Sequence, residues 1–268
     1  MKNFLVLDKS FLQAVPKRRV DELNNSYKLL IPEVMLYELV KGAPEDRANW
    51  FSRLPSTDRP FELSRNLGYY LRYEKENLLS CGLPSLHVRT IDHSATKNYR
   101  NPEYSIPPDL SLLRYNRKNQ VDEDVNSLFL LTKSIGEILP ETKGIPPKDR
   151  KKAQEYLEEK IASDEIFLKD AVNKIMPHTH PENSEVNKSW ISYRWLQVNL
   201  LFALDYWTRY TQEIDLTTET KQLERFRHDA LDAGYLIIGL QEGAFATKEK
   251  KLIRWWNRIL PKGVLIQG

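Results

Sequence analysis

Short apolar runs and helical patterns alternate at the beginning of the chain. Phe4 to Leu7 is apolar throughout, which predicts a strand buried on both faces, as in a parallel sheet. YKLLIP predicts a second strand, and a helix interrupted at Pro16 is expected between the two. EVMLYELVKG then follows a helical period and ends at Gly42, a residue that commonly terminates helices. This order of strand, helix, strand and helix predicts an α/β fold.

The C-terminal end shows the same kind of pattern. Residues 219–242 follow a helical period, and GAFAT predicts a short strand that begins at Gly243. KEKKLIRWWNRIL predicts a further helix, and VLI predicts a last strand. Both ends of the chain are therefore expected to contribute to one sheet.

The middle of the chain has a different pattern. From about residue 49 to residue 213, helical segments are separated by proline-rich breaks such as KGIPPKDR, without a clear strand alternation. DLTTET offers an N-cap for the next helix. We therefore predict an α/β core with a parallel sheet flanked by helices, formed by residues 1–48 and 219–268. A large all-helical insertion is expected at 49–218.

Composition narrows the class of protein without identifying it. The chain has 268 residues, 41% of them hydrophobic and 29% charged, which is typical of globular proteins. Cys81 is the single cysteine, so a disulfide framework and a thiolate zinc site are excluded, and burial as a small hydrophobe is expected. The net charge of +3 permits nucleic-acid binding but does not require it. The apolar start is interrupted at Asp8 and no run approaches the ~20 apolar residues of a membrane span. We expect a cytoplasmic protein that does not bind membranes.

Acidic residues fall where the predicted sheet can bring them together. Asp8 ends the first strand and Glu249 follows the GAFAT strand, and sites in open α/β sheets form at the carboxyl ends of strands. Glu38 lies in an early helix, and Asp229 and Asp232 are three residues apart on the helix that precedes GAFAT. Clustered carboxylates repel one another unless a cation neutralises them, and oxygen ligands suit Mg²⁺ or Mn²⁺.

The motifs FLVLDKS, IPEVMLYEL, HDALDAGYLIIGL and AFATKEKKL, in this order, resemble those of PIN-domain nucleases. The resemblance covers residues 1–42 and 225–268. It implies an endonuclease that hydrolyses phosphodiester bonds with Mg²⁺ or Mn²⁺, in RNA more often than in DNA. Such a nuclease needs restraint in a cell, so the resemblance also suggests a toxin-like or antiphage effector controlled by an inhibitory or activating protein partner.

The resemblance also assigns roles to individual residues of this chain. It implies metal ligands at four positions, a fifth catalytic acid, and two hydroxyl side chains that support the site. The implied metal ligands are Asp8, Glu38, Asp229 and Asp232, and the fifth catalytic acid is Glu249. The two supporting hydroxyl side chains are those of Ser10 and Thr247. Glu249 departs from the family, which usually has Asp there, and between the two acids of the helix Asp229 ranks first.

Each acid also has an ordinary structural interpretation. Asp8 alone is typical of a strand end, and Glu38 of a solvated helix. Asp229 and Asp232 can pair with neighbouring basic side chains, and Glu249 is favoured at a helix N-terminus. These alternatives leave open a catalytically weak or inactive PIN-like module that binds nucleic acid or a protein through its helical insertion. A homo-oligomer is compatible with either interpretation.

Basic residues near the predicted acids suggest a contact with the substrate backbone. The candidates are Lys9, Lys248, Lys250, Lys251 and Arg254, with ordinary solvated charges as the alternative. Trp255 and Trp256, between these charges, are expected in the core. His178 and His180 have no third ligand nearby in the sequence, so we expect a loop there and no metal site.

Overall fold

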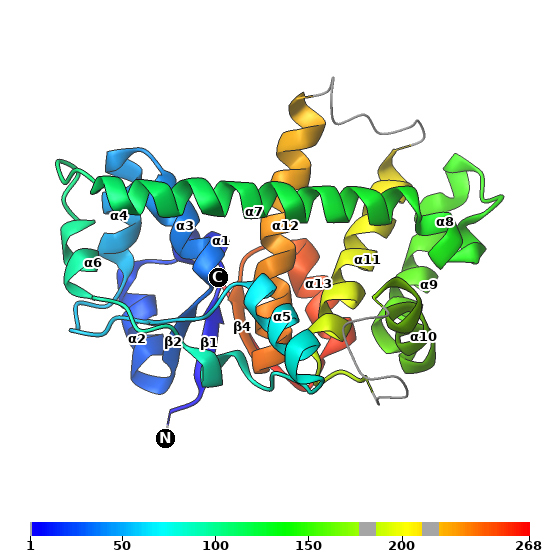
Figure 1. Ribbon diagram of the computed structural model, residues 1–268, viewed down its shortest axis with the longest axis horizontal. Helices are drawn as coiled ribbons and strands as arrows, with labels where there is room; N and C mark the ends of the chain where they lie inside the picture. Colours follow the sequence, from blue (N-terminus) through cyan, green and yellow to red (C-terminus); the bar gives the residue numbers. More distant parts are fainter. Residues whose placement is uncertain (1, 177–185, 211–219) are drawn as a thin grey trace. The chain divides into compact units, whose positions relative to one another are not determined.

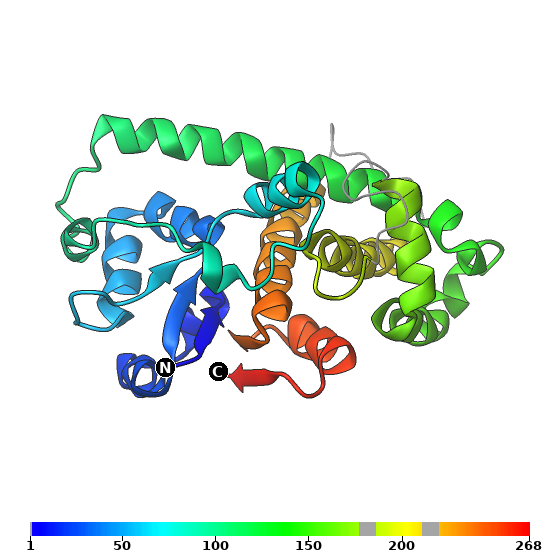
Figure 2. The ribbon, with the colours of Figure 1, turned by 60° about the horizontal axis from the view of Figure 1, so that its bottom comes forward.

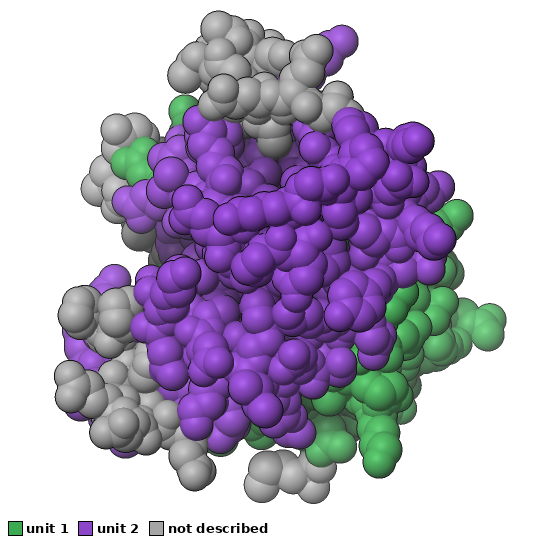
Figure 3. Space-filling model, turned by 90° about the vertical axis from the view of Figure 1, so that its right-hand side faces the viewer, with its two compact units in different colours: residues 1–70, 82–119, 234–268 green, residues 71–81, 120–233 purple. Residues whose placement is uncertain are grey.

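The computed structural model describes residues 2–176, 186–210 and 220–268 (Figure 1). It is an α/β structure with a five-stranded parallel sheet and flanking helices. The chain divides into two compact units, shown in different colours in Figure 3. Unit 1 comprises residues 1–70, 82–119 and 234–268, and unit 2 comprises residues 71–81 and 120–233.

Unit 1 contains the sheet, whose strand order is β3-β2-β1-β4-β5. The strands are β1 (Phe4–Leu7), β2 (Lys28–Ile31), β3 (Glu62–Leu63), β4 (Ala244–Thr247) and β5 (Val264–Gln267). The central strand β1 pairs with β2 on one side and with β4 on the other, so that Val6 is opposite both Leu30 and Phe245. The chain moves outward from β1 through β2 to β3, and in the other direction from β4 to β5. The switch point of the topology therefore lies between β1 and β4.

The helices of unit 1 connect these strands. They are α1 (Lys9–Ala14), α2 (Lys17–Ser26), α3 (Glu33–Lys41), α4 (Pro44–Arg53), the beginning of α5 (Leu67–Asn77), α6 (Ser94–Asn98) and α13 (Lys250–Ile259), with a 3-10 turn at Pro84–His87. Residues 108–119 of α7 (Pro108–Lys133) and 234–242 of α12 (Thr220–Glu242) also belong to unit 1. Figure 2 shows α12 leading into β4, after which the chain returns through α13 to β5. Since parallel crossovers are right-handed, the helices that follow β1 and β2 cover one face of the sheet and α13 covers the other.

The four strands expected from the apolar runs are confirmed, but the expectation of a wholly helical middle was wrong. β3 lies at Glu62–Leu63 and pairs with β2, with a further hydrogen bond of 3.0 Å from the Ser64 amide to the Ile31 carbonyl. A two-residue strand has no alternation to detect, and it forms because the edge of β2 offers backbone partners. The units also differ from the expected boundaries, because unit 1 includes residues 49–70 and 82–119 and begins again at 234, inside α12.

The core of unit 1 is formed by the strands and the helix that precedes β4. The central strand residues, such as Leu5 and Phe245, are fully buried. A Cβ atom on Gly239 of α12 would lie 2.8 Å from the Phe245 ring, so glycine allows this helix to approach β4 closely. Trp255 and Trp256 of α13 are buried, which confirms their expected place in the core.

Unit 2 is helical in its described part. It contains residues 120–133 of α7 (Pro108–Lys133), then α8 (Ile135–Ile138), α9 (Arg150–Ser163), α10 (Glu165–Ile175), α11 (Ile191–Arg209), residues 220–233 of α12 and the end of α5, with 3-10 turns at Pro140–Thr142 and Pro147–Asp149. The helical pattern at 148–175 is broken at Asp164, whose side chain accepts the Phe167 amide at 2.9 Å and caps α10. Within the described ranges, no helix has the length and hydropathy to cross a membrane.

Helix α11 is the centre of unit 2. It contacts α8, α9 and α10, and it is buried on nearly all sides from Ile191 to Tyr206. Its N-terminus has no capping side chain of its own. Instead, the fully buried Glu74 carboxylate of α5 accepts the backbone amides of Ile191 at 2.7 Å and Ser192 at 2.9 Å. Cys81 is buried as expected, and burial, together with the Glu74 carboxylate, raises the pKa of its thiol.

Candidate functional site

Asp8 lies at the carboxyl end of β1, at the switch point of the sheet, and is 1% exposed. It is the N-cap of α1, and its carboxylate accepts the Ser10 amide at 3.2 Å. Two hydroxyl groups also donate to its Oδ2 atom, Ser10 Oγ at 2.5 Å and Thr247 Oγ1 at 2.6 Å. Because Thr247 ends β4, the Asp8 carboxylate joins the carboxyl ends of the two central strands.

The two hydroxyl groups also hold the chain that follows β4. Ser10 Oγ accepts the Lys248 amide at 3.1 Å, and Thr247 Oγ1 accepts the Glu249 amide at 3.0 Å. Each hydroxyl has one hydrogen, which it donates to Asp8, and so its lone pairs remain available for these amides. The structure thus brings together Asp8 and the two residues predicted to support it.

The electrostatics of Asp8 disfavour its negative charge. Burial raises the pKa of Asp8, the hydrogen bonds from Ser10 and Thr247 oppose this effect, and the negative charge of Glu249 raises the pKa further. Glu249 is exposed, directly before α13. A buried carboxylate with a second acid nearby is stabilised in its ionised form by a cation.

Glu38 already has a cationic partner in unit 1. It lies in α3, is 5% exposed, and forms an ion pair of 3.0 Å with the ammonium group of Lys9. The Tyr235 hydroxyl also donates a hydrogen bond to Glu38. The ammonium group of Lys9 lies 5.0 Å from the centroid of the Trp50 ring, so this lysine is held between a carboxylate and an aromatic face.

Tyr235 and Trp50 are residues of this region that the sequence does not predict. Tyr235 precedes Gly239 by one helical turn and lies on the same face of α12, where the close approach to the sheet brings its hydroxyl to Glu38. Trp50 reaches the region because Gly42 leaves space for its ring, which would lie 2.5 Å from a Cβ atom there. The spacing Asp232–Tyr235 is the one signal in the sequence that singles out Tyr235.

Asp229 and Asp232 belong to unit 2. Asp229 is 6% exposed, and burial, together with the nearby Asp229 carboxylate, raises the pKa of Tyr206. Asp232 is partly exposed. The burial of Asp229 disagrees with the interpretation of a solvated ion pair with a neighbouring basic side chain. The guanidinium group of Arg225, one helical turn before Asp229, donates to the Tyr210 hydroxyl at 2.7 Å. The roles of both acids as ligands stay predictions.

Among the described residues, the chemistry of the possible ligand atoms suits a divalent cation, but too few of these atoms lie together to hold one. Asp8 and Glu249 supply the carboxylate oxygens that Mg²⁺ and Mn²⁺ prefer, whereas Lys9 already pairs with Glu38. In the described part of the chain, no three Asp, Glu, His or Cys side chains form a group that could hold a metal ion. His178 and His180 lie outside the described residues.

Four of the five predicted basic contacts form an exposed surface on α13 and the residues before it, whereas Lys9 lies in α1 and pairs with Glu38. Lys248, Lys250 and Arg254 are exposed and Lys251 is partly exposed. The opposite face of this helix is buried through its two tryptophans. The basic surface begins directly after Thr247, next to the Asp8 hydrogen bonds in the chain.

Comparisons of this chain with protein-family models, with curated proteins and with solved structures find no match. The case for a function therefore depends on the site geometry and on the motif resemblance.

Proposed function

We propose that unit 1 is the core of a divalent-cation-dependent, PIN-like nuclease that hydrolyses phosphodiester bonds, in RNA in preference to DNA. The observation that carries this proposal is the position of Asp8. It is buried at the switch point of a parallel sheet, where it is held by hydroxyl groups from two segments that are far apart in the sequence. The exposed basic surface after β4 adds cations that suit a phosphate backbone.

Each group in the proposed site has a distinct role. Asp8 and Glu249 would hold Mg²⁺ or Mn²⁺, together with the predicted ligand Glu38. The ligand roles of Asp229 and Asp232, which belong to unit 2, stay predictions from the motif resemblance. Ser10 and Thr247 fix the orientation of the Asp8 carboxylate. When bound, a divalent cation supplies an activated water and stabilises the departing oxygen. The basic side chains of α13 hold the substrate backbone without reading its sequence.

Lys9 has a special place in this proposal because it competes for Glu38. Its ammonium group must move away before the Glu38 carboxylate can serve as a ligand. The Tyr235 hydroxyl keeps this carboxylate oriented in either state. The toxin-like or antiphage role and the controlling partner are part of the same proposal and are supported by the motif resemblance alone. The cytoplasmic location stays a prediction from the sequence.

Cleavage of labelled nucleic acid tests the proposal directly. The purified protein is incubated with single-stranded RNA and DNA and with Mn²⁺, beside the Asp8→Ala variant and the control Asp58→Ala, which removes an exposed acid of the same unit. We expect cleavage by the wild type and the control, and a loss of roughly a hundredfold or more for Asp8→Ala. Absence of cleavage by the wild type, or equal rates for all three proteins, would exclude the nuclease.

A second candidate function is favoured by the Lys9–Glu38 ion pair. With this pair in place and without a three-acid group among the described side chains, unit 1 can act as a binding module that does not cleave. Gel retardation of the same RNA in the presence of a chelator separates the two functions. Retention by both wild type and Asp8→Ala, without cleavage in Mn²⁺, supports the binding module and contradicts the nuclease.

A further inference from the structure

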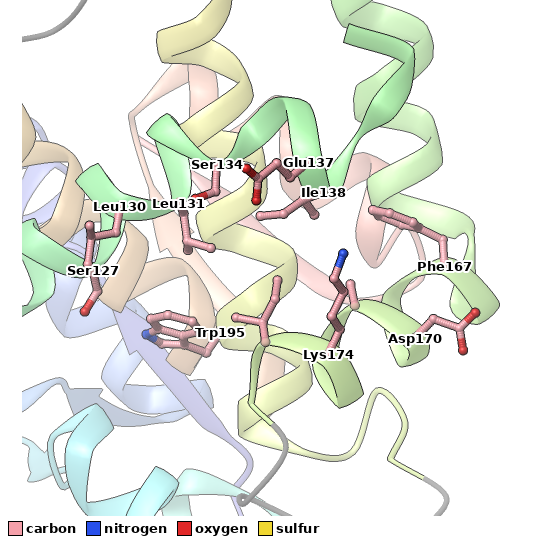
Figure 4. A pocket seen from close by; sticks show the side chains of 12 residues that line it. Ser127, Leu130, Leu131, Ser134, Glu137, Ile138, Phe167, Asp170, Lys174 and Trp195 are labelled. Carbon is pink, nitrogen blue, oxygen red and sulfur yellow. The ribbon is translucent and has the colours of Figure 1, made fainter. Parts of the chain in front are cut away.

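Unit 2 contains a pocket that plays no part in the proposed nuclease. Its volume is about 500 Å³, and it lies among four helices, α7, α8, α10 and α11 (Figure 4). Most of its wall is apolar, with side chains Leu130, Leu131, Ile138, Phe167, Ala171, Ile175 and Trp195. A volume of this size, between the helices of a bundle, is in the range of small-molecule sites.

The apolar wall is open to solvent at the pocket. Leu130 is 62% exposed, and the Phe167 and Trp195 rings are both partly exposed. When an apolar molecule fills the pocket, the exposed leucine and aromatic surfaces are removed from water, which favours binding. The wall thus favours a ligand with a flat or elongated apolar body.

One cationic group extends into this hollow. Figure 4 shows the Lys174 side chain rising from α10 with its ammonium group between Ile138 and Phe167. In the part of the chain that the structure describes, the Lys174 ammonium forms no ion pair or hydrogen bond. The Glu137 carboxylate lies along the wall near Ser134, and the Asp170 carboxylate points away from Lys174. The lining thus holds two carboxylates and one ammonium group, and it is the ammonium group of Lys174 that lies between the apolar side chains of Ile138 and Phe167.

We propose that this pocket binds a small molecule that combines an apolar, aromatic or aliphatic body with one anionic carboxylate or sulfonate group. The body fills the space between Leu131, Phe167 and Trp195, and the anionic group pairs with the Lys174 ammonium. An anion that is held beside apolar walls is screened less by water than one on an open surface, so the charge contributes to affinity as well as to orientation. The ligand site is independent of the nuclease proposal.

Fluorescence of 8-anilinonaphthalene-1-sulfonate tests this site, because the probe has an aromatic body and one sulfonate. Its uncharged analogue, N-phenyl-1-naphthylamine, isolates the contribution of the anion. Lys174→Gln removes the cation, and Ala171→Trp fills the pocket. Lys152→Gln removes an exposed lysine of α9 outside the pocket and serves as the matched control. Circular dichroism shows that each variant is folded.

We expect one saturable site for the sulfonate probe on the wild type and on Lys152→Gln. Lys174→Gln should weaken the binding of the sulfonate probe by about fivefold and leave the uncharged analogue unchanged, which corresponds to the loss of one charge pair with an exposed lysine. Ala171→Trp should abolish binding of both probes. Equal sulfonate affinity in the wild type and Lys174→Gln would overturn the proposal, and so would undiminished binding to a folded Ala171→Trp protein.

Discussion

Two buried carboxylates, Glu74 in unit 2 and Asp8 in unit 1, illustrate how differently the two units use a negative charge. Both are almost completely inaccessible to solvent. Glu74 accepts three backbone amides, from Cys81, Ile191 and Ser192, and it also forms a hydrogen bond with the Cys81 thiol. Asp8 accepts two side-chain hydroxyls and one amide, next to the acidic Glu249.

The difference lies in what stabilises each charge. The amides at a helix N-terminus carry partial positive charge, so the charge of Glu74 is compensated by the fold itself. The neutral hydroxyls around Asp8 compensate less than burial costs, and its pKa is raised as a result. Glu74 therefore has a structural role. The negative charge of Asp8 is only partly compensated by its hydrogen bonds, and a bound cation would complete the compensation.

The largest expected effect concerns the structural carboxylate. Glu74→Gln leaves buried amides of Ile191 and Ser192 without a charged acceptor, so unfolding should become easier by roughly 2 kcal/mol. Denaturant unfolding measures this change, with Glu76→Gln on the exposed face of the same helix as the control. The loss should be the same with and without Mn²⁺. A loss below about 0.5 kcal/mol, as for an ordinary surface substitution, would contradict the structural role.

A smaller effect of opposite sign is expected at Asp8. Because its pKa is higher in the folded than in the unfolded chain, folding favours the protonated carboxyl, and this contribution to stability is lost as the pH rises through the folded pKa. Asp8→Asn should therefore be more stable than the wild type at pH 7, by about 2–4 °C in Tm without a divalent cation.

The same comparison at acidic pH checks the cause. Below about pH 3 the carboxyl is protonated in both states, so the two proteins should melt at nearly the same temperature. Thermal melting from pH 3 to pH 8, with Asp58→Asn as the exposed control, measures the difference. A wild type that is more stable than Asp8→Asn at pH 7 in a chelator would show that the hydrogen bonds outweigh burial.

Most of the sheet is predictable because its central strands are continuous apolar runs. Phe4–Leu7 and the GAFAT segment both form buried strands where the pattern predicts them. β3 is not predictable, since two residues carry no periodicity and the strand depends on the free edge of β2. The boundary between the two units inside α12 cannot be predicted from the sequence either, because the helical period continues across it.

The candidate site is predictable in part for a similar reason. The positions of Asp8 and Thr247 follow from strand ends, which parallel pairing brings to one edge of the sheet. The contacts of Glu38 with Lys9 and with Tyr235 depend on how far side chains of three different helices reach, which the sequence pattern does not measure. The pocket around Lys174 is likewise not predictable from the sequence, because it is formed by the packing of four helices.

The central claim is that the Asp8 region binds a divalent cation and that Lys9 competes with this cation for the Glu38 carboxylate. The shift of Tm on addition of Mn²⁺ tests it most directly, measured for the wild type, Asp8→Asn and Lys9→Met, with Lys28→Met as the control lysine of the same unit. We predict an upward shift for the wild type and the control, a larger shift for Lys9→Met, and none for Asp8→Asn. An equal shift in all four proteins, or no shift in any of them, would contradict the claim.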